Sequence, residues 1–151
     1  MGELEKMVRR LDEQTVEISL PNKMGCERIA MDCSASFARI VGFASKRIED
    51  LKTAVSEACI NAIEHGNKGR PDTRVLVTMD FNGDIFSVSV KDEGDGIPEL
   101  PKDEVVLQKI EALEPPTGLG IYLIKQLVDQ VEFNAKTNGG HAVRMAIKLT
   151  S

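Results

Sequence analysis

The chain is poor in the residues that build metal centres and disulfide frameworks. Among its 151 residues it has two histidines, three cysteines, one tyrosine and no tryptophan. A structural zinc site needs four cysteine or histidine ligands at short spacings, and this sequence does not offer them. Cys26, Cys33 and Cys59 are odd in number and lack C-x-x-C spacing, which indicates reduced thiols. Cys33 and Cys59 fall on apolar helical stripes, so we expect both to pack in the core.

Long apolar runs and an excess of basic residues are also absent. No run approaches the roughly 20 residues needed to span a bilayer, and residues 1–10 lack the apolar core of a signal peptide. These absences predict a cytoplasmic protein that does not contact a membrane. The formal net charge is −5, which argues against direct binding of nucleic acid.

The remaining composition is typical of one globular domain. Hydrophobic residues make up 42% of the chain and charged residues 28%, and the length is sufficient for one sizeable core. We expect a charged, mobile segment over residues 1–12 and a single domain over residues 13–151. No internal repeat or low-complexity tract divides this domain.

Hydrophobic periodicity predicts a mixture of strands and helices. Alternating apolar residues predict five strands, at residues 15–20, 75–81, 86–90, 131–136 and 142–149. Apolar residues spaced by three and four predict helices at residues 27–44 and 50–66, separated by a break at 45–49, and another after residue 120. Asn82-Gly83 is the favoured pair for a type I′ turn, so we expect the second and third strands to form a hairpin.

The predicted helix at residues 50–66 carries a polar stripe opposite its apolar one. Glu57, Asn61 and Glu64 recur at helical spacing, so their side chains share a face. A carboxylate can take a proton, and a carboxamide oxygen can ligate a hard cation such as Mg²⁺. The alternative is a solvated helix face without chemistry, and the spacing alone does not separate the two.

Two glycine-containing segments further along the chain suit a close approach by something other than protein. The hairpin leads into D-E-G-D-G-I-P at residues 92–98, where Gly94 and Gly96 do not suit a regular strand. G-L-G at residues 118–120 opens a strongly apolar helix, whose first turn has free N–H groups. The long charged segment at residues 99–117 is a candidate lid.

Together these features are chemically consistent with a nucleotide site. Glycine turns and helix N-termini offer N–H groups to phosphate. Asn61 can hold Mg²⁺, and Glu57, one turn away, can orient or deprotonate the group that attacks the γ-phosphate. Asp92 at a strand end can accept a hydrogen bond from an exocyclic amine, and Gly94 and Gly96 leave room for a flat ring.

The same residues carry a resemblance to a known family. S-E-A-C-I-N-A-I-E-H-G resembles the N-box of the GHKL ATPases, in the form typical of bacterial anti-sigma factor serine-protein kinases. D-E-G-D-G-I resembles their G1 box, and G-L-G-I-Y-L-I-K-Q-L-V-D-Q-V resembles their G2 box. Order and spacing agree over roughly residues 13–150. The resemblance implies a Bergerat-type ATP-binding α/β fold: a two-layer α+β sandwich in which helices cover one face of a mixed β-sheet.

The resemblance also implies roles for individual residues. Glu57 would be the catalytic general base, Asn61 would ligate Mg²⁺, and Asp92 would recognise the adenine of ATP. The other cofactor-binding residues would line the adenine pocket or contact phosphates through their backbone: Gly94, Gly96, Ile97, Gly118, Leu119 and Gly120. Residues 99–117 would be the ATP lid.

Some positions depart from the family pattern or have a second interpretation. Gly140-His141 stands where the family's last hairpin commonly has Gly-Thr, and the threonine hydroxyl supports the adenine site. Here a water or the histidine replaces that hydroxyl, or nucleotide binding is weaker. The lid has only Lys102 and Lys109 as cations, so the sequence does not identify the residue that would neutralise the γ-phosphate. Glu64 also suits a solvated surface, and His65 also suits the negative end of the helix dipole.

Two functions fit the resemblance. The first is a Mg-ATP-dependent serine-protein kinase and anti-sigma factor, which phosphorylates a STAS-domain anti-anti-sigma protein and sequesters a sigma factor. The alternative is a non-catalytic, ATP-gated regulator-binding module. Glu57 and Asn61 favour the kinase, whereas His141 and the sparse lid cations keep the alternative open. The resemblance further implies a homodimer.

Overall fold

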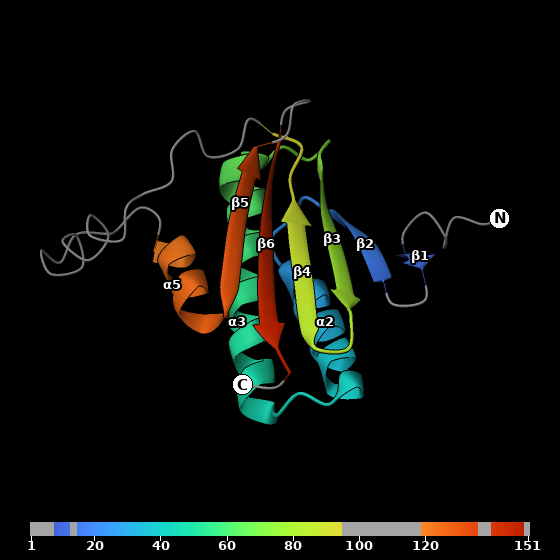
Figure 1. Ribbon diagram of the computed structural model, residues 1–151. Coiled ribbons are helices and arrows are strands. Elements are labelled where there is room, and N and C mark those ends of the chain that lie inside the picture. Colours follow the sequence, from blue (N-terminus) through green and yellow to red (C-terminus); the bar gives the residue numbers. More distant parts are fainter. Residues whose placement is uncertain (1–7, 13–14, 95–118, 136–139, 150–151) are drawn as a thin grey trace, which may run out of the picture.

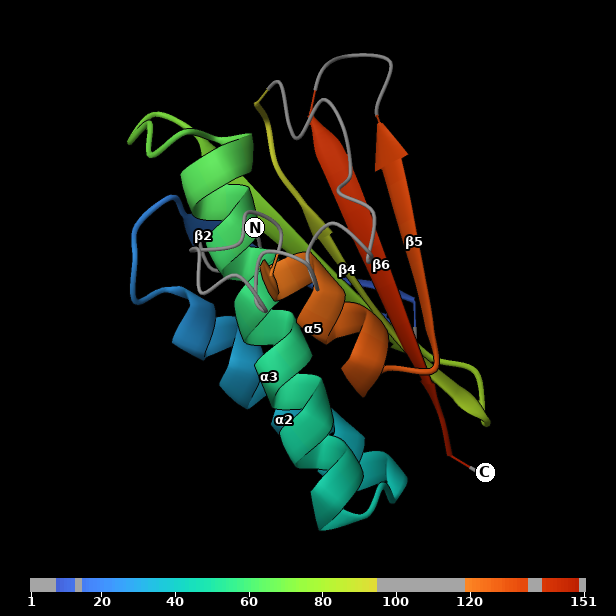
Figure 2. The same ribbon diagram turned by 90° about the vertical axis from the view of Figure 1, so that its left-hand side faces the viewer.

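The computed structural model describes residues 8–12, 15–94, 119–135 and 140–149, which form one sheet covered by helices. The strands are Val8–Asp12 (β1), Thr15–Pro21 (β2), Arg74–Phe81 (β3), Ile85–Lys91 (β4), Gln130–Ala135 (β5) and His141–Lys148 (β6), in the order β1-β2-β3-β4-β6-β5. The helices are Glu27–Val41 (α2), Ser45–Asn61 (α3) and Leu119–Leu127 (α5), and a π-helical turn, Ala62–Gly66 (η1), continues α3. All of them lie on one face of the sheet (Figures 1 and 2). No helix in these ranges is long and apolar enough to cross a membrane.

The expected two-layer sandwich is confirmed, but the sheet is not mixed. All strand pairings among the described residues are antiparallel. The reason lies in the connection from β4 to β5. These two strands run in the same direction, and α5 lies between them in the sequence. β6 lies between these two strands and pairs with both, because Val143 is opposite Val90 of β4 and Phe133 of β5. The parallel pair that the α5 crossover would otherwise create is therefore absent from the described sheet.

The hairpin of β3 and β4 forms as predicted, but with a different turn. Gly83 has a φ of 104°, and neither of its neighbours has a positive φ. The N–H of Asn82 donates to the carbonyl of Ile85 at 3.2 Å, so Gly83 and Asp84 are the two central residues. A positive φ at the first central residue alone is typical of a type II′ turn, not of type I′. Asn82 instead closes the turn, because its side chain accepts hydrogen bonds from the N–H groups of Asp84 and Ile85.

Helix α3 begins about one turn earlier than predicted. Residues 45–49 form its first turn, where the sequence predicted a break. Ile48 is only 3% exposed and precedes the fully buried Leu51 by three positions, so the apolar stripe extends back through this turn. The chain breaks instead at Gly42, whose φ of 105° ends α2, and at Ala44, which is extended.

The first described strand lies where the sequence predicted a mobile segment. Residues 8–12 form β1, which pairs with β2 at the edge of the sheet and places Val8 opposite Ile18. Backbone hydrogen bonds to an edge strand require no apolar pattern, so the charged sequence V-R-R-L-D does not reveal this strand. Residues 1–7 and the expected lid at residues 99–117 lie outside the described residues.

The packing predictions for Cys33 and Cys59 are confirmed. All three cysteines are free thiols, Cys59 is fully buried on α3, and Cys33 is partly buried against the core. Burial raises the pKa of the Cys59 thiol to about 12, and the charge of Glu27 adds to the shift. Burial also raises the pKa of the Cys33 thiol, and the charge of Asp32 adds to the shift. Both thiols therefore have less thiolate than an ordinary cysteine, which suits packing rather than reaction.

Candidate functional site

Three of the predicted site residues meet where the end of α3 faces the start of α5. Glu57 and Asn61 lie one turn apart on α3, and both are partly exposed. A β-carbon built on Gly120, in the first turn of α5, would lie 2.7 Å from Oε2 of Glu57 and 3.3 Å from Nδ2 of Asn61. A residue with a side chain at position 120 would displace the carboxylate or the helix. These two members of the polar stripe therefore face the N-terminus of another helix, and do not form a plain solvated face.

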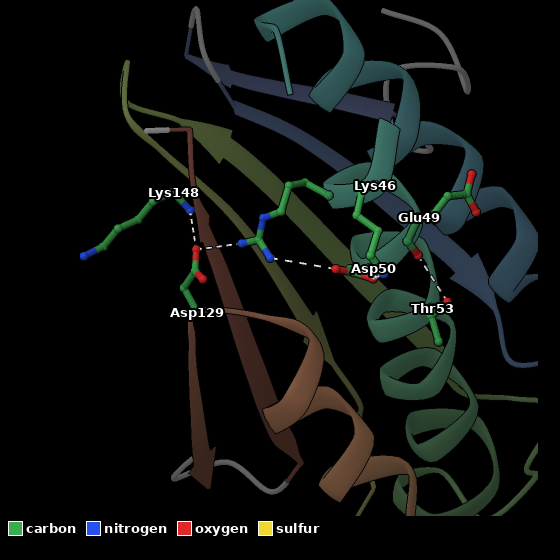
Figure 3. Close-up of polar contacts among 7 residues, drawn as sticks. Lys46, Glu49, Asp50, Thr53, Asp129 and Lys148 are labelled. Carbon is green, nitrogen blue, oxygen red and sulfur yellow. Dashed lines mark hydrogen bonds and ion pairs between the residues drawn. The ribbon is translucent and has the colours of Figure 1, made fainter. Parts of the chain in front are cut away.

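An ionic anchor holds α5 at its other end. The guanidinium of Arg47, in the first turn of α3, donates to Oδ2 of Asp129, just after α5, at 2.7 Å. The same Asp129 oxygen accepts a hydrogen bond from the backbone N–H of Lys148 at 2.7 Å, which ties it to β6 (Figure 3). Since α3 and α5 run antiparallel, this anchor and the Gly120 contact together fix the α5 N-terminus over Glu57 and Asn61.

The π-helical turn η1 carries the end of α3 to a second cluster. The backbone N–H of Asn67 donates to the carbonyl of Ala62 at 2.7 Å, an i→i+5 bond that widens the last turn. Gly66 then lies directly against the carboxylate of Asp92, and a β-carbon at position 66 would overlap it. Gly94 in turn lies against the carbonyl of Gly66, again with no room for a β-carbon. Both glycines are therefore required by close packing.

Asp92 is a buried, oriented carboxylate at the end of β4. It is 8% exposed and follows the core residues Val88 and Val90 at alternate positions, so it lies on the helix-covered face of the sheet. Its Oδ1 accepts hydrogen bonds from the N–H groups of Gly94 at 3.1 Å and His141 at 3.0 Å. A carboxylate fixed in this way is preorganised to accept a further hydrogen bond from a ligand.

His141 supports Asp92 through its backbone. Besides donating to Oδ1, it accepts a hydrogen bond from the N–H of Asp92 through its carbonyl at 2.9 Å. The Nδ1 atom of its imidazole is buried and has no hydrogen-bond partner among the described residues. Among the described residues, this nitrogen therefore makes no hydrogen bond that would replace the threonine hydroxyl of the family pattern.

Two buried asparagines lie behind the second cluster, and no sequence pattern indicated their role. Asn67 has no exposed surface, and its Nδ2 donates to Oδ1 of Asn22 and to the carbonyl of Arg74, both at 3.0 Å. Its Oδ1 accepts a hydrogen bond from the N–H of Glu93 at 2.8 Å. Asn22, after β2, donates to the carbonyl of Arg70 at 3.0 Å. In the sequence both asparagines stand beside a glycine or a proline, so they look like turn residues.

The predicted site residues thus fall into two clusters, and three of them lie outside the residues that the structure describes. Glu57, Asn61 and Gly120 form one cluster, with Leu119 beginning α5 beside it. Asp92 and Gly94 belong to the other. The predicted residues that lie outside the described ones are Gly96, Ile97 and Gly118. Glu64 and His65 are exposed residues of η1 whose side chains lie 4.0 Å apart, in keeping with surface roles.

The first cluster has the groups that a Mg-nucleotide complex requires. The start of α5 offers free N–H groups and the positive end of a helix dipole beside a carboxylate and a carboxamide. The described residues contain no group of three or more histidine, cysteine, aspartate or glutamate side chains that could hold a metal alone. Mg²⁺ does not need one, because it usually keeps several waters and takes substrate phosphate oxygens as ligands. The oxygen of Asn61 therefore fits Mg²⁺ that arrives with a nucleotide.

Comparison with known families identifies the domain. The profile of the histidine kinase-like ATPase domain matches residues 23–147, which include both clusters. The chain belongs to the histidine kinase-like ATPase family. Its two clusters are accordingly parts of a nucleotide-using domain.

The relatives of this histidine kinase-like ATPase narrow the assignment. It is 34% identical over 137 residues to the serine-protein kinase RsbW of Bacillus pumilus, and the match covers 86% of this chain and 83% of that protein. It is 28% identical over 137 residues to an anti-sigma F factor of Halalkalibacterium halodurans, covering 85% of this chain and 94% of that protein. Within its family, the chain belongs with the anti-sigma factor serine-protein kinases.

Two solved structures share the fold. One contains the RsbU and RsbW domains of a Mycobacterium tuberculosis protein, with a TM-score of 0.65 and 19% identity, and the match covers 93% of this chain but 34% of that chain. The other is the SiaB-SiaC complex from Pseudomonas aeruginosa, with a TM-score of 0.66 and 13% identity, covering 95% and 92% of the two chains. At these identities the likeness supports the fold alone.

Proposed function

We propose that this protein is a Mg-ATP-dependent serine-protein kinase and anti-sigma factor that phosphorylates a STAS-domain anti-anti-sigma protein and sequesters a sigma factor. The similarity to a serine-protein kinase and to an anti-sigma F factor, each over most of the chain, supports this proposal. The structural observation that carries it is the contact of Gly120 with Glu57 and Asn61. This contact brings an anion-binding helix end against a carboxylate base and a carboxamide ligand.

In this mechanism three elements of the site bind the nucleotide. The free N–H groups at the start of α5, including those of Leu119 and Gly120, donate to phosphate oxygens. The carboxamide oxygen of Asn61 would hold Mg²⁺, and the ion would supply positive charge that offsets the charge of the phosphates. The carboxylate of Asp92 accepts a hydrogen bond from the exocyclic amine of adenine and so orients the base.

Glu57 acts on the substrate serine. Its carboxylate accepts the hydroxyl proton while the serine oxygen bonds to the γ-phosphorus and the bond from that phosphorus to the β,γ-bridging oxygen breaks. The products are phosphoserine, ADP and a protonated Glu57, which returns its proton to water. Glu57 is partly exposed, so a protein substrate can reach it.

The homodimer is part of the same proposal. The side chains of Met24, Ile29 and Ile40, on α2 or just before it, are 49%, 48% and 83% exposed. Exposed large apolar side chains of this kind are compatible with a protein contact surface along α2. Sedimentation velocity over a range of concentrations checks the dimer, and a monomer at every concentration would contradict it.

A second candidate is a non-catalytic, ATP-gated regulator-binding module. The observation that favours it concerns His141, beside the second cluster. The Nδ1 atom of its imidazole is buried and has no hydrogen-bond partner among the described residues. A buried nitrogen without a partner lowers the free energy of unfolding, and it does not replace the threonine hydroxyl that supports the adenine site in the family pattern.

Label transfer separates the two candidates. The protein is incubated with Mg²⁺, γ-labelled ATP and candidate STAS-domain proteins. The kinase proposal expects label on a serine of one partner, and loss of that label in Glu57→Ala with ATP binding retained. Glu64→Ala is the matched control, because Glu64 is an exposed carboxylate near the end of the same helix and its loss leaves transfer unchanged. ATP binding without label on any partner, unaffected by Glu57→Ala, would establish the binding module instead.

A further inference from the structure

The two clusters of the site are joined through the short segment that ends α3. Asn61 is the last residue of α3, and the five residues of η1 lead from it to Gly66, which contacts Asp92. The relative position of the two clusters therefore depends on what holds this segment against the end of β4.

Asn67 is the residue that makes this connection through its side chain. It uses both Nδ2 hydrogens and Oδ1, and the three bonds reach three segments: Asn22 after β2, Arg74 at the start of β3, and Glu93 after β4. Its backbone N–H closes the π-helical turn at Ala62. A side chain with no exposed surface and all these bonds made fixes its neighbours more firmly than a solvated turn residue does.

The bond to Glu93 is the one that bears on the nucleotide. Glu93 lies between Asp92 and Gly94, two residues beyond Lys91, which is the last residue of β4 that pairs with a neighbouring strand. The N–H that donates to Oδ1 of Asn67 belongs to the peptide bond between Asp92 and Glu93. The hydrogen bond therefore restrains the backbone that carries the Asp92 carboxylate.

We propose that Asn67 is a positioning residue that keeps Asp92 and Gly94 in register with Glu57 and Asn61. This inference rests on the proposed nucleotide site. Asn67 does not touch the nucleotide in this scheme, and it acts through Asp92. Residues that orient ligand-contacting groups in this way typically change affinity or activity by about 10- to 100-fold when they are lost, as outer-shell partners of metal ligands do.

Base selectivity separates positioning from a merely structural role. Asp92 accepts a hydrogen bond from the exocyclic amine of adenine, whereas guanine presents a carbonyl oxygen at that position, which the carboxylate repels. The wild-type protein should therefore bind ATP more tightly than GTP. Loss of fold stability alone lowers both affinities by the same factor, but a displaced Asp92 lowers the affinity for ATP selectively.

The experiment measures Kd for Mg-ATP and Mg-GTP by calorimetry, and unfolding by urea, for the wild type, Asn67→Ala and Asn22→Ala. Asn22→Ala is the matched control, because it removes a buried partner of Asn67 but leaves the Asn67–Glu93 bond. We expect both variants to be less stable than the wild type. Only Asn67→Ala should raise the Kd for ATP by about tenfold or more and lose most of the preference for ATP.

Each other outcome overturns the inference. An equal loss of ATP and GTP affinity in Asn67→Ala, or the same loss in Asn22→Ala, would leave Asn67 a purely structural residue while the nucleotide site stands. A wild-type protein that binds neither nucleotide would refute the proposed function, and this inference with it. Should Asn67→Ala not fold, Asn67→Ser takes its place with the same expectations, because its shorter side chain cannot reach all three partners.

Discussion

Gly120→Ala adds one methyl group at the contact between α5 and α3, and the structure gives the size of the resulting displacement. The new β-carbon would lie 2.7 Å from Oε2 of Glu57, whereas ordinary van der Waals contact begins at 3.4 Å. If the carboxylate moves and the helices stay in place, it reaches ordinary contact by retreating about 0.7 Å, the difference between these two distances. The Asn61 atoms lie 3.3 and 3.5 Å away, so the carboxamide needs to move little.

The expected effects on stability and on transfer have opposite signs. Alanine is favoured over glycine in a helix by up to about 1 kcal/mol, and the Glu57 side chain is flexible and partly exposed, so we expect the free energy of unfolding to stay constant or rise. A base displaced by close to 1 Å from its productive position costs on the order of 100-fold in rate. Gly120→Ala should therefore fold at least as well as the wild type, bind ATP, and transfer phosphate about 100-fold more slowly.

Gly42→Ala is the matched control for this prediction. Gly42 ends α2 with a φ of 105°, and a β-carbon there would meet no neighbouring atom. Alanine in this conformation costs about 1 kcal/mol, so this variant should be less stable but fully active. Urea unfolding and single-turnover transfer of γ-labelled phosphate to a STAS-domain substrate measure both quantities. A Gly120→Ala protein with the wild-type transfer rate would show that the contact with Glu57 has no part in catalysis.

Three further predictions concern other residues. Asn61→Ala should abolish or greatly weaken Mg-ATP binding, and unchanged affinity by calorimetry would refute the Mg²⁺ assignment. Arg47→Ala should lower the free energy of unfolding by about 1 kcal/mol in urea, because it releases the anchor between α3 and Asp129; no change would show that the anchor is not stabilising. The Cys59 thiol has a raised pKa of about 12, against 9.0 in its ordinary state, so its contribution to stability is complete below about pH 9 and is lost as the pH rises towards 12. Urea titrations across that window should show a fall that Cys59→Ala reduces, and an equal fall in both proteins would contradict the burial of this thiol.

The first cluster could be predicted from the sequence because its chemistry is local. Glu57 and Asn61 lie four positions apart on a helix whose apolar stripe is clear, so their shared face follows from helix geometry. Gly120 stands at the start of an apolar helix, and a glycine there already indicates that an anion or another part of the chain approaches the backbone closely. Only the pairing of these two helix ends required the structure.

The second cluster could be predicted only in part, because its contacts join distant parts of the chain. Asp92 follows a strand with clear alternation, so its position at the end of that strand was predictable. Asn22 and Asn67, however, are 45 positions apart, and each has the sequence context of an ordinary turn. The insertion of β6 between β4 and β5 is equally invisible to periodicity, because a strand's own pattern does not name its partners.

The π-helical turn explains why the polar stripe of the predicted helix divides as it does. An uninterrupted α-helix would place Glu64 on the same face as Glu57 and Asn61. The i→i+5 bond from Asn67 to Ala62 widens the last turn, in which Glu64 is exposed and Gly66 meets Asp92. A side chain on residue 66 would prevent that contact, and a regular last turn would present a different residue to Asp92. The break in helical periodicity after Asn61 is therefore the feature that lets one helix serve both clusters of the site.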